Sequence, residues 1–223
     1  MNTLSYFLSF YCRSALSLRR KRADQFRGYI WSLSTLPNQA LRIMDVGGTR
    51  TYYHEMGNPP SWCTVHLINP GAGWLWYRRV WNKCEAMSAD TLKHMEAGSY
   101  DVIFSNSTLA YVGGRKERAE CAYHMQRITP RIFLQTPNKW FPLSWRTGVP
   151  FFQYLPDAWQ ARILTWTRVG RDARIPDYAA ALAYVRQADD VDYAELMRLF
   201  PCAAIQREKV FGFTKSFIVL QGF

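Results

Sequence analysis

Short apolar runs alternate with a stretch of helical composition between residues 41 and 135. The apolar runs predict strands at residues 41–46, 63–68, 100–104 and 131–135, with a weaker strand at about 83–87. Residues 114–127, between the last two strands, have helical composition. Because strands that alternate with helices form parallel sheets covered by those helices, this part of the chain is predicted to have an α/β fold.

The pattern changes after Pro137. Residues 138–156 are rich in Trp, Phe and Pro, and this composition predicts an irregular loop. Helical patterns follow at residues 157–169, 177–187 and 193–199. Strand patterns return at residues 202–210 and 214–220, on either side of Phe211-Gly212-Phe213. Two strands joined by so short a turn predict an antiparallel hairpin at the end of the chain.

The first 18 residues are largely apolar, with Arg13 among them, and the basic run Arg19-Arg20-Lys21-Arg22 follows. A secretory signal has its charges first, and a helix that spans a bilayer needs ~20 apolar residues. The segment is therefore expected to be an amphipathic helix that packs on the domain. The alternative is a helix on an anionic membrane surface, with the basic run facing the headgroups. Because no secretory signal is seen, the expected location is the cytoplasm, with membrane association as an option.

The composition is typical of one globular domain. The chain has 223 residues, 48% of them hydrophobic and 20% charged, which is enough to bury a core. Its net charge of +11 favours an acidic partner, such as nucleic acid, an anionic lipid surface or an anionic substrate, although an ordinary basic enzyme fits equally well. Five widely spaced Cys without a CxxC pair, and four His without ligand spacing, predict neither a disulfide framework nor a metal site.

Glycines and polar residues follow the first two predicted strands. In Asp45-Val46-Gly47-Gly48-Thr49 the glycines allow a sharp turn whose amides face a polar ligand outside the strand end. Asn69 follows the second strand, where a side chain can reach ribose hydroxyls by accepting one hydrogen bond and donating another. Taken alone, each segment is equally compatible with an ordinary tight turn.

Later segments extend this series. Ser88-Ala89-Asp90 and residues 98–107, which end in Ser105-Asn106-Ser107, resemble, together with the glycine turn, the motifs of class I S-adenosylmethionine-dependent methyltransferases. Residues 135–142 (QTPNKWFP) and 207–216 resemble a bacterial branch of that family with small-molecule or glycan-like substrates. Five motifs occur in the family's order, so the resemblance runs from residue 41 to the C-terminus.

The resemblance implies a Rossmann-like fold with a mostly parallel seven-stranded sheet, an antiparallel C-terminal hairpin and a helical, aromatic lid inserted at about 138–192. Residues 1–40 would form a helical extension of a methyltransferase domain at 41–223. It also implies S-adenosylmethionine as the cofactor, with Asp90 near its adenine amino group. The residues expected to bind the cofactor are Asp45, Gly47, Gly48, Thr49, Asn69, Asp90, Ser105 and Asn106.

The chain departs from the family pattern where a general base would lie. A Glu-His pair of the family is Ala110-Tyr111 here, and a second Glu and His are replaced by Ser144 and Arg146. Methyl transfer from a sulfonium is a direct displacement without an enzyme nucleophile, whereas a hydroxyl acceptor benefits from a base. Tyr111 and His124 are the candidate catalytic residues, with packing roles as the alternative. A carboxylate acceptor would need no base.

The aromatic segment after Pro137 suits a planar or lipid-like acceptor. The residues expected to bind it are Asn138, Trp140, Trp145 and Arg146. The alternative for the aromatic side chains is that they only pack the insert against the sheet. The predicted function is O-methylation of a small molecule, a sugar, a glycan or a lipid-linked intermediate. An RNA methyltransferase and a non-catalytic partner subunit are the other hypotheses, and a dinucleotide oxidoreductase is disfavoured because G-x-G-x-x-G is absent.

Overall fold

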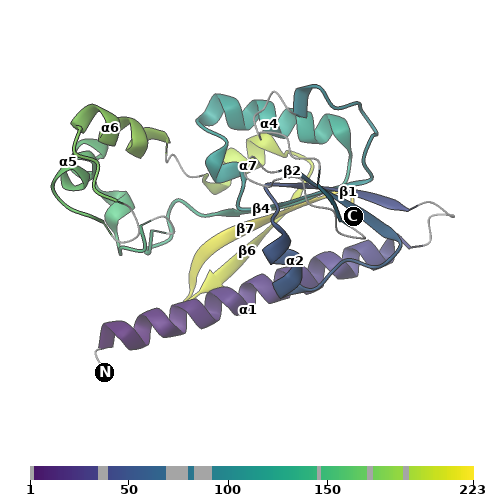
Figure 1. The fold of residues 1–223 in the computed structure, drawn as a ribbon, viewed down its shortest axis with the longest axis horizontal. Coiled ribbons are helices and arrows are strands. Elements are labelled where there is room, and N and C mark those ends of the chain that lie inside the picture. The colour runs from purple at the N-terminus through teal and green to yellow at the C-terminus, as the bar shows by residue number, and fades with distance from the viewer. Residues whose placement is uncertain are drawn as a thin grey trace.

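One mixed sheet runs through the molecule (Figure 1). The computed structural model describes residues 3–34, 40–68, 80–82, 92–144, 147–169, 173–187 and 191–223. Within them, the sheet has seven strands in the order β3-β2-β1-β4-β5-β7-β6. The strands are β1 (Leu41–Val46), β2 (Cys63–Ile68), β3 (Val80–Asn82), β4 (Val102–Asn106), β5 (Ile132–Pro137), β6 (Ala204–Val210) and β7 (Phe213–Gln221).

Strands β1 to β5 pair in parallel, whereas β7 is antiparallel to both β5 and β6. Strand β5 is buried at every position, as expected for a parallel strand that is covered on both faces. The predicted α/β fold, with a mostly parallel sheet and a C-terminal hairpin, is therefore confirmed. Strand β3 lies just ahead of the weak strand predicted at 83–87, and those residues fall outside the described part of the chain.

Helices cover both faces of the sheet, with α1 and α2 on one side and α4 and α7 on the other (Figure 1). The described helices are α1 (Thr3–Ser32), α2 (Arg50–Met56), α4 (Arg115–Ile128), α5 (Asp157–Trp166), α6 (Tyr178–Gln187) and α7 (Tyr193–Leu199), with short 3₁₀ helices at Leu109–Tyr111 and Phe152–Tyr154. The four helices predicted after residue 114 are confirmed, although α5 ends at Trp166 rather than at 169.

Separate clusters of buried side chains hold the two layers of helices. Phe26 and Ile30 of α1 pack on the sheet, and the ring of Phe26 lies 4.4 Å from that of Phe104. On the opposite face, Met125 of α4 and Leu196 of α7 belong to a second cluster. The sheet is thus the middle layer of three, which fixes where the ends of its strands emerge.

Helix α1 is an integral part of this core. Arg22, Phe26 and Ile30, which lie four residues apart on one face of the helix, are all buried. This buried face lies beyond residues 1–18, for which the sequence predicts packing on the domain, so that packing stays a prediction. If the whole basic run contacted lipid headgroups, Arg22 would have to point outward. Instead, Arg22 points into the protein, toward Glu208. None of the described helices combines the length and apolar character needed to cross a bilayer.

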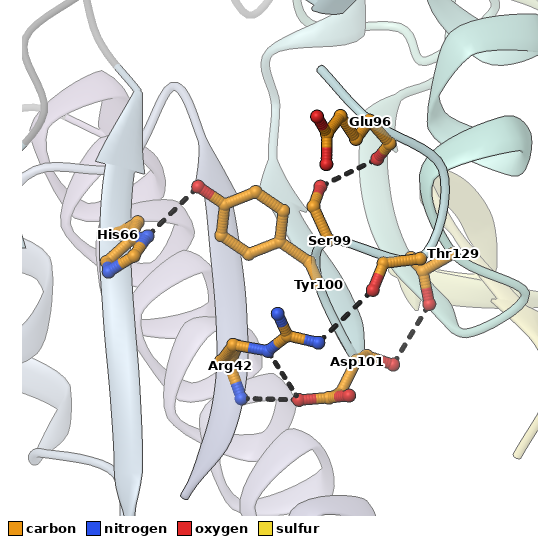
Figure 2. Close-up of polar contacts among 8 residues, drawn as sticks. Arg42, His66, Glu96, Ser99, Tyr100, Asp101 and Thr129 are labelled. Atoms are coloured by element: carbon orange, nitrogen blue, oxygen red, sulfur yellow. Dashed lines mark hydrogen bonds and ion pairs between the residues drawn. The ribbon is translucent and has the colours of Figure 1, made fainter.

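A polar network ties β1 to the entry of β4 at their amino-terminal ends (Figure 2). The Asp101 carboxylate accepts a hydrogen bond from the Arg42 backbone nitrogen at 2.7 Å and pairs with the Arg42 guanidinium at 3.5 Å. Thr129 donates to the Asp101 carbonyl at 3.0 Å, and His66 Nδ1 lies 2.9 Å from the Tyr100 hydroxyl. Because this end of the strands is fixed, the register at their opposite ends is fixed as well.

Helices α5 and α6 form a small unit beside the sheet (Figure 1). Its buried side chains come from its own residues and form a cluster apart from the two sheet clusters: Phe152, Ala161, Leu164, Val169, Ala181 and Val185. This unit occupies most of the segment 138–192, which the sequence predicts to be an insert.

Candidate functional site

The turn that leaves β1 is built so closely that only glycine fits. Gly47 has φ +81°, and a Cβ on it would lie 2.0 Å from the Thr108 Oγ1. A Cβ on Gly48 would lie 2.0 Å from the Asp45 Oδ2. Thr49 then caps α2, because its hydroxyl accepts a hydrogen bond from the Tyr52 nitrogen at 3.3 Å. The two glycines are therefore required by the close approach of a hydroxyl and a carboxylate.

The end of β4 is held against the end of β1 by hydroxyl groups. The Val46 carbonyl accepts hydrogen bonds from Thr108 Oγ1 at 2.7 Å and from Ser105 Oγ at 3.2 Å. Ser107 has φ +67°, and its hydroxyl donates to Gln135 Oε1 of β5 at 2.7 Å. Ser105 and Ser107 are thus committed to holding three strand ends together, which places Asn106 between them at the edge of the sheet.

A cavity of about 210 Å³ opens at this edge, between the strand ends and helices α1 and α2. Its lining residues are Arg19, Asp45, Gly47, Gly48, Thr49, Thr51, Tyr52, Glu55, Phe104 and Asn106. Five of the eight residues predicted to bind a cofactor line it. Ser105 is not among the lining residues, and its hydroxyl holds the neighbouring Val46 carbonyl. Asn69 and Asp90 lie outside the described residues.

Asp45 is fully buried in the cavity wall. Its Oδ2 accepts a hydrogen bond from the Tyr53 hydroxyl at 2.7 Å, whereas its Oδ1 has no partner within the described part of the chain. Burial raises the pKa of the carboxyl group to about 7, and the Tyr53 hydroxyl opposes that rise. A buried carboxylate with an unused oxygen is costly unless a cation or a hydrogen-bond donor joins it. The site is therefore suited to a ligand with such a group.

Helix α1 supplies a second, buried charge beside the cavity. Arg22 Nη1 donates to the Asn106 Oδ1 at 3.1 Å, and Arg22 Nε lies 3.4 Å from the Glu208 carboxylate. Glu208 in turn accepts a hydrogen bond from Ser216 at 2.5 Å. Burial lowers the pKa of Arg22, and the charge of Glu208 opposes that effect. Arg22 thus fixes the Asn106 side chain in the cavity wall.

Sequence reasoning missed this role of α1. The sequence predicts a role for the basic run Arg19–Arg22 only in the membrane alternative, where it would face headgroups, yet Arg22 continues the buried stripe of Phe26 and Ile30. A charged residue at the buried spacing of an amphipathic helix is the signal that could have identified it. Arg19 lies almost one turn earlier and lines the cavity, where it pairs with Glu55 of α2 at 3.4 Å.

No protein-family model matches the chain, and no curated protein matches its sequence. Solved structures do match its fold. The plantazolicin methyltransferase BpumL, in complex with SAH, superimposes with a TM-score of 0.51 at 10% identity, over 96% of this chain and 88% of that one. The N-terminal domain of EvdMO1 with SAH bound gives a TM-score of 0.52 at 13% identity, over 90% and 80%.

Magnesium protoporphyrin IX methyltransferase from Synechocystis PCC 6803, with bound SAH, gives a TM-score of 0.50 at 10% identity, over 91% of this chain and 83% of that one. The chain has the class I methyltransferase fold. The resemblance deduced from the motifs is thus confirmed at the level of the fold. The cavity lies where the methyltransferase fold, like other open α/β sheets, binds ligands, outside the carboxyl ends of its parallel strands.

The two predicted catalytic residues lie outside the lining of this cavity. Tyr111 ends the 3₁₀ helix after β4, and 64% of it is exposed. His124 lies on α4, where partial burial and the nearby Arg127 lower its pKa. In this methyltransferase fold Tyr111 follows the strand that borders the cavity, whereas His124 is held within the helical layer. A role as general base stays a prediction for both.

The residues predicted to bind the acceptor are only partly described. Asn138 donates to the Thr214 carbonyl at 2.7 Å and accepts from the Trp140 nitrogen at 3.1 Å, so its amide joins the exit of β5 to the hairpin. Trp140 is 57% exposed, and its ring stacks on Tyr154 with centroids 6.1 Å apart. Trp145 and Arg146 lie outside the described residues.

Proposed function

We propose that the chain is an S-adenosylmethionine-dependent methyltransferase that transfers a methyl group to an oxygen of a small molecule, a sugar or a lipid-linked intermediate. The observation that carries the proposal is Asp45, a buried carboxylate with one oxygen that has no partner among the described residues, beside two glycines whose Cβ positions are already filled. At such a turn, the backbone and the Asp45 carboxylate can closely approach a positively charged ligand that has hydrogen-bond donors. S-adenosylmethionine supplies, when bound, a methyl group activated by its sulfonium.

The residues of the chain have distinct roles in this proposal. Asp45 accepts a hydrogen bond from the cofactor and offsets its positive charge, while Gly47 and Gly48 allow close backbone contact. Asn106, held by Arg22, presents its amide to the cavity. Asn69 would bind the ribose hydroxyls and Asp90 the adenine amino group, as the family resemblance implies. The main contribution of the protein to the rate is then alignment of the acceptor with the methyl group.

The acceptor is proposed to bind under the segment 138–192, which acts as a lid. This segment carries exposed rings, among them Trp140 and Phe151. Both lie against the ring of Tyr154, at 6.1 and 5.9 Å between centroids, and a contiguous exposed apolar patch of this kind marks a binding surface. A planar or amphipathic acceptor fits such a surface. A hydroxyl acceptor would use Tyr111 as the base, because Tyr111 follows the strand end at the cavity, whereas a carboxylate acceptor would use none.

Calorimetric titration of the purified chain with S-adenosylmethionine and S-adenosylhomocysteine tests the cofactor proposal. In Asp45→Asn, the new amide can still accept the Tyr53 hydrogen bond but carries no charge, so the affinity for both ligands should fall by about 100-fold. Glu96→Gln makes the same chemical change at an exposed position and should leave both affinities unchanged. If the folded wild-type protein binds neither ligand, the proposal is wrong and a non-catalytic subunit is favoured.

A further inference from the structure

Helix α1 brings a cation to the cavity that the motifs of the fold do not include. Arg19 lines the cavity together with Glu55, and the two side chains form an ion pair at 3.4 Å. Both side chains are nearly half exposed, at 45% and 47%. Because an ion pair so exposed to water contributes little free energy, another carboxylate can replace Glu55 on Arg19 at small cost.

The neighbouring Arg22 is not available for such an exchange. Its guanidinium is buried between Glu208 and Asn106, and Glu208 is further held by Ser216. Removing a buried partner from Arg22 would leave an uncompensated charge in the core. Of the two arginines of α1 beside the cavity, Arg19 is therefore the one that is suited to bind a ligand.

The strand order indicates which part of the cofactor reaches Arg19. Strands β3 and β2 lie on one side of β1, and β4 lies on the other. The residues proposed for adenine and ribose, Asp90 and Asn69, follow β3 and β2. The cavity lies on the opposite side, because it is lined by Phe104 and Asn106 of β4 and by α1 and α2. The end of the cofactor that points away from the adenosine is its amino-acid end.

We infer that Arg19, with Glu55 and Asp45, forms a subsite for the zwitterionic amino-acid end of S-adenosylmethionine, with Arg19 binding the carboxylate. This inference rests on the proposed function. The guanidinium fork matches a carboxylate in two parallel hydrogen bonds, and the two acidic side chains on the same wall match the ammonium group. The ligand group thereby pairs with both members of the Arg19–Glu55 ion pair at once.

The inference makes α1 a part of the cofactor site. The same helix packs on the sheet through Phe26 and Ile30, so the position of Arg19 is set by the core and not by a surface loop. The proposed partner of Arg19 is the carboxylate of the ligand alone. Removing that carboxylate from the ligand therefore tests the inference, because a purely structural role of Arg19 would not depend on it.

The test is a thermodynamic cycle with two changes, Arg19→Gln in the protein and loss of the carboxylate in the ligand. The probes are S-adenosylmethionine and decarboxylated S-adenosylmethionine, which keeps the sulfonium and the ammonium, and binding is measured by calorimetry and by competition. In the wild type, decarboxylation should weaken binding by about tenfold or more. In Arg19→Gln, S-adenosylmethionine should lose the same factor, and decarboxylation should cause no further loss.

Arg20→Gln removes an equal charge from the next, exposed position and should bind both ligands as the wild type does. If the two losses multiply in Arg19→Gln, or if that variant binds S-adenosylmethionine at full affinity, the inference is overturned while the proposed function stands. If the wild type binds neither ligand, the proposed function itself fails. Because Arg19 is half exposed, the thermal midpoint of Arg19→Gln should stay at the wild-type value, which separates lost binding from lost folding.

Discussion

The two halves of the candidate site are built in opposite ways. The cofactor half, around the ends of β1 and β4, places fully buried polar groups such as Asp45 and Ser105 in a wall of tight backbone contacts. The acceptor half, within residues 138–192, buries Phe141 and Phe152 but leaves several large rings in solvent. The exposed rings are Trp140, Phe151, Tyr154, Trp159, Trp166 and Tyr178.

This difference shows how one fold can keep its cofactor and change its acceptor. In the cofactor half the buried groups pack closely against neighbouring side chains and backbone, so most substitutions there damage packing as well as chemistry. In the acceptor half the ring surface rests on a cluster of its own, centred on Phe152. Substitutions of the exposed rings should therefore change what binds without changing the sheet.

The largest effect is expected at the glycine turn of the cofactor half. Gly47→Ala places a methyl group 2.0 Å from the Thr108 hydroxyl and also strains a backbone at φ +81°. We expect the free energy of unfolding to fall by about 4 kcal/mol and cofactor binding to be lost. Denaturant titration, followed by circular dichroism, measures the first effect, and calorimetry with S-adenosylhomocysteine measures the second.

Gly212 offers a matched control for that prediction. It has the same φ of +81° in the hairpin turn, but no atom lies within 4 Å of the Cβ that alanine would add. Gly212→Ala should therefore cost only the backbone strain, about 1 kcal/mol. Equal losses in the two variants would show that the turn after β1 relaxes around a side chain, and that the tight contact with Thr108 is not what requires glycine.

The next largest effect is a gain in stability. The pKa of Asp45 is about 7 in the folded chain, whereas an unfolded carboxyl group titrates near pH 4. Between these values the folded state binds more protons, so the free energy of unfolding falls as the pH rises from about 4 to about 7 and then levels off. Asp45→Asn removes this cost and should be more stable than the wild type by about 3 kcal/mol at pH 8.

The comparison that tests this is denaturant unfolding of wild type and Asp45→Asn at pH 4 and at pH 8. At pH 4 both side chains are neutral in the folded state, so the difference should nearly vanish. Glu96→Gln, at an exposed carboxylate, should show no gain at either pH. A variant that loses cofactor affinity and gains stability would identify Asp45 as a group kept for binding at the expense of stability. A loss of stability at pH 8 would contradict the proposed cost of burying the charged carboxylate.

The features of the fold that depend on residues adjacent in the sequence were predictable from it. Helix α7 spans Tyr193–Leu199 as predicted, because Asp192 caps it through the Glu195 nitrogen and Pro201 follows its end. The glycine turn was predictable for the same reason, since a strand followed by paired glycines determines the local backbone, whereas the binding of a ligand by these residues stays a prediction. Five of the predicted cofactor residues line one cavity.

The parts of the site that depend on distant contacts were not predictable. Arg22 reaches Asn106, 84 residues away, and Glu208 lies at the other end of the chain. Neither partner can be found from a local pattern, because Asn106 ends β4 and Glu208 lies on β6, and only the fold brings both to α1. Asn138 shows the converse: its place in a recognisable motif suggested a ligand, and the structure gives both its amide atoms backbone partners.

The smallest effect on the cofactor site is expected from a change in the acceptor half. Phe152→Ala removes a large side chain from the cluster of α5 and α6, and we expect this unit to lose about 2 kcal/mol of local stability. Hydrogen exchange should accelerate at the amides of α5 and α6 and stay unchanged in β1, β4 and β5. Because Phe152 packs with neither sheet cluster, the affinity for S-adenosylhomocysteine should change by less than about twofold. A parallel loss of cofactor affinity would mean that the halves fold as one cooperative unit, and that acceptor preference cannot change without a change in cofactor binding.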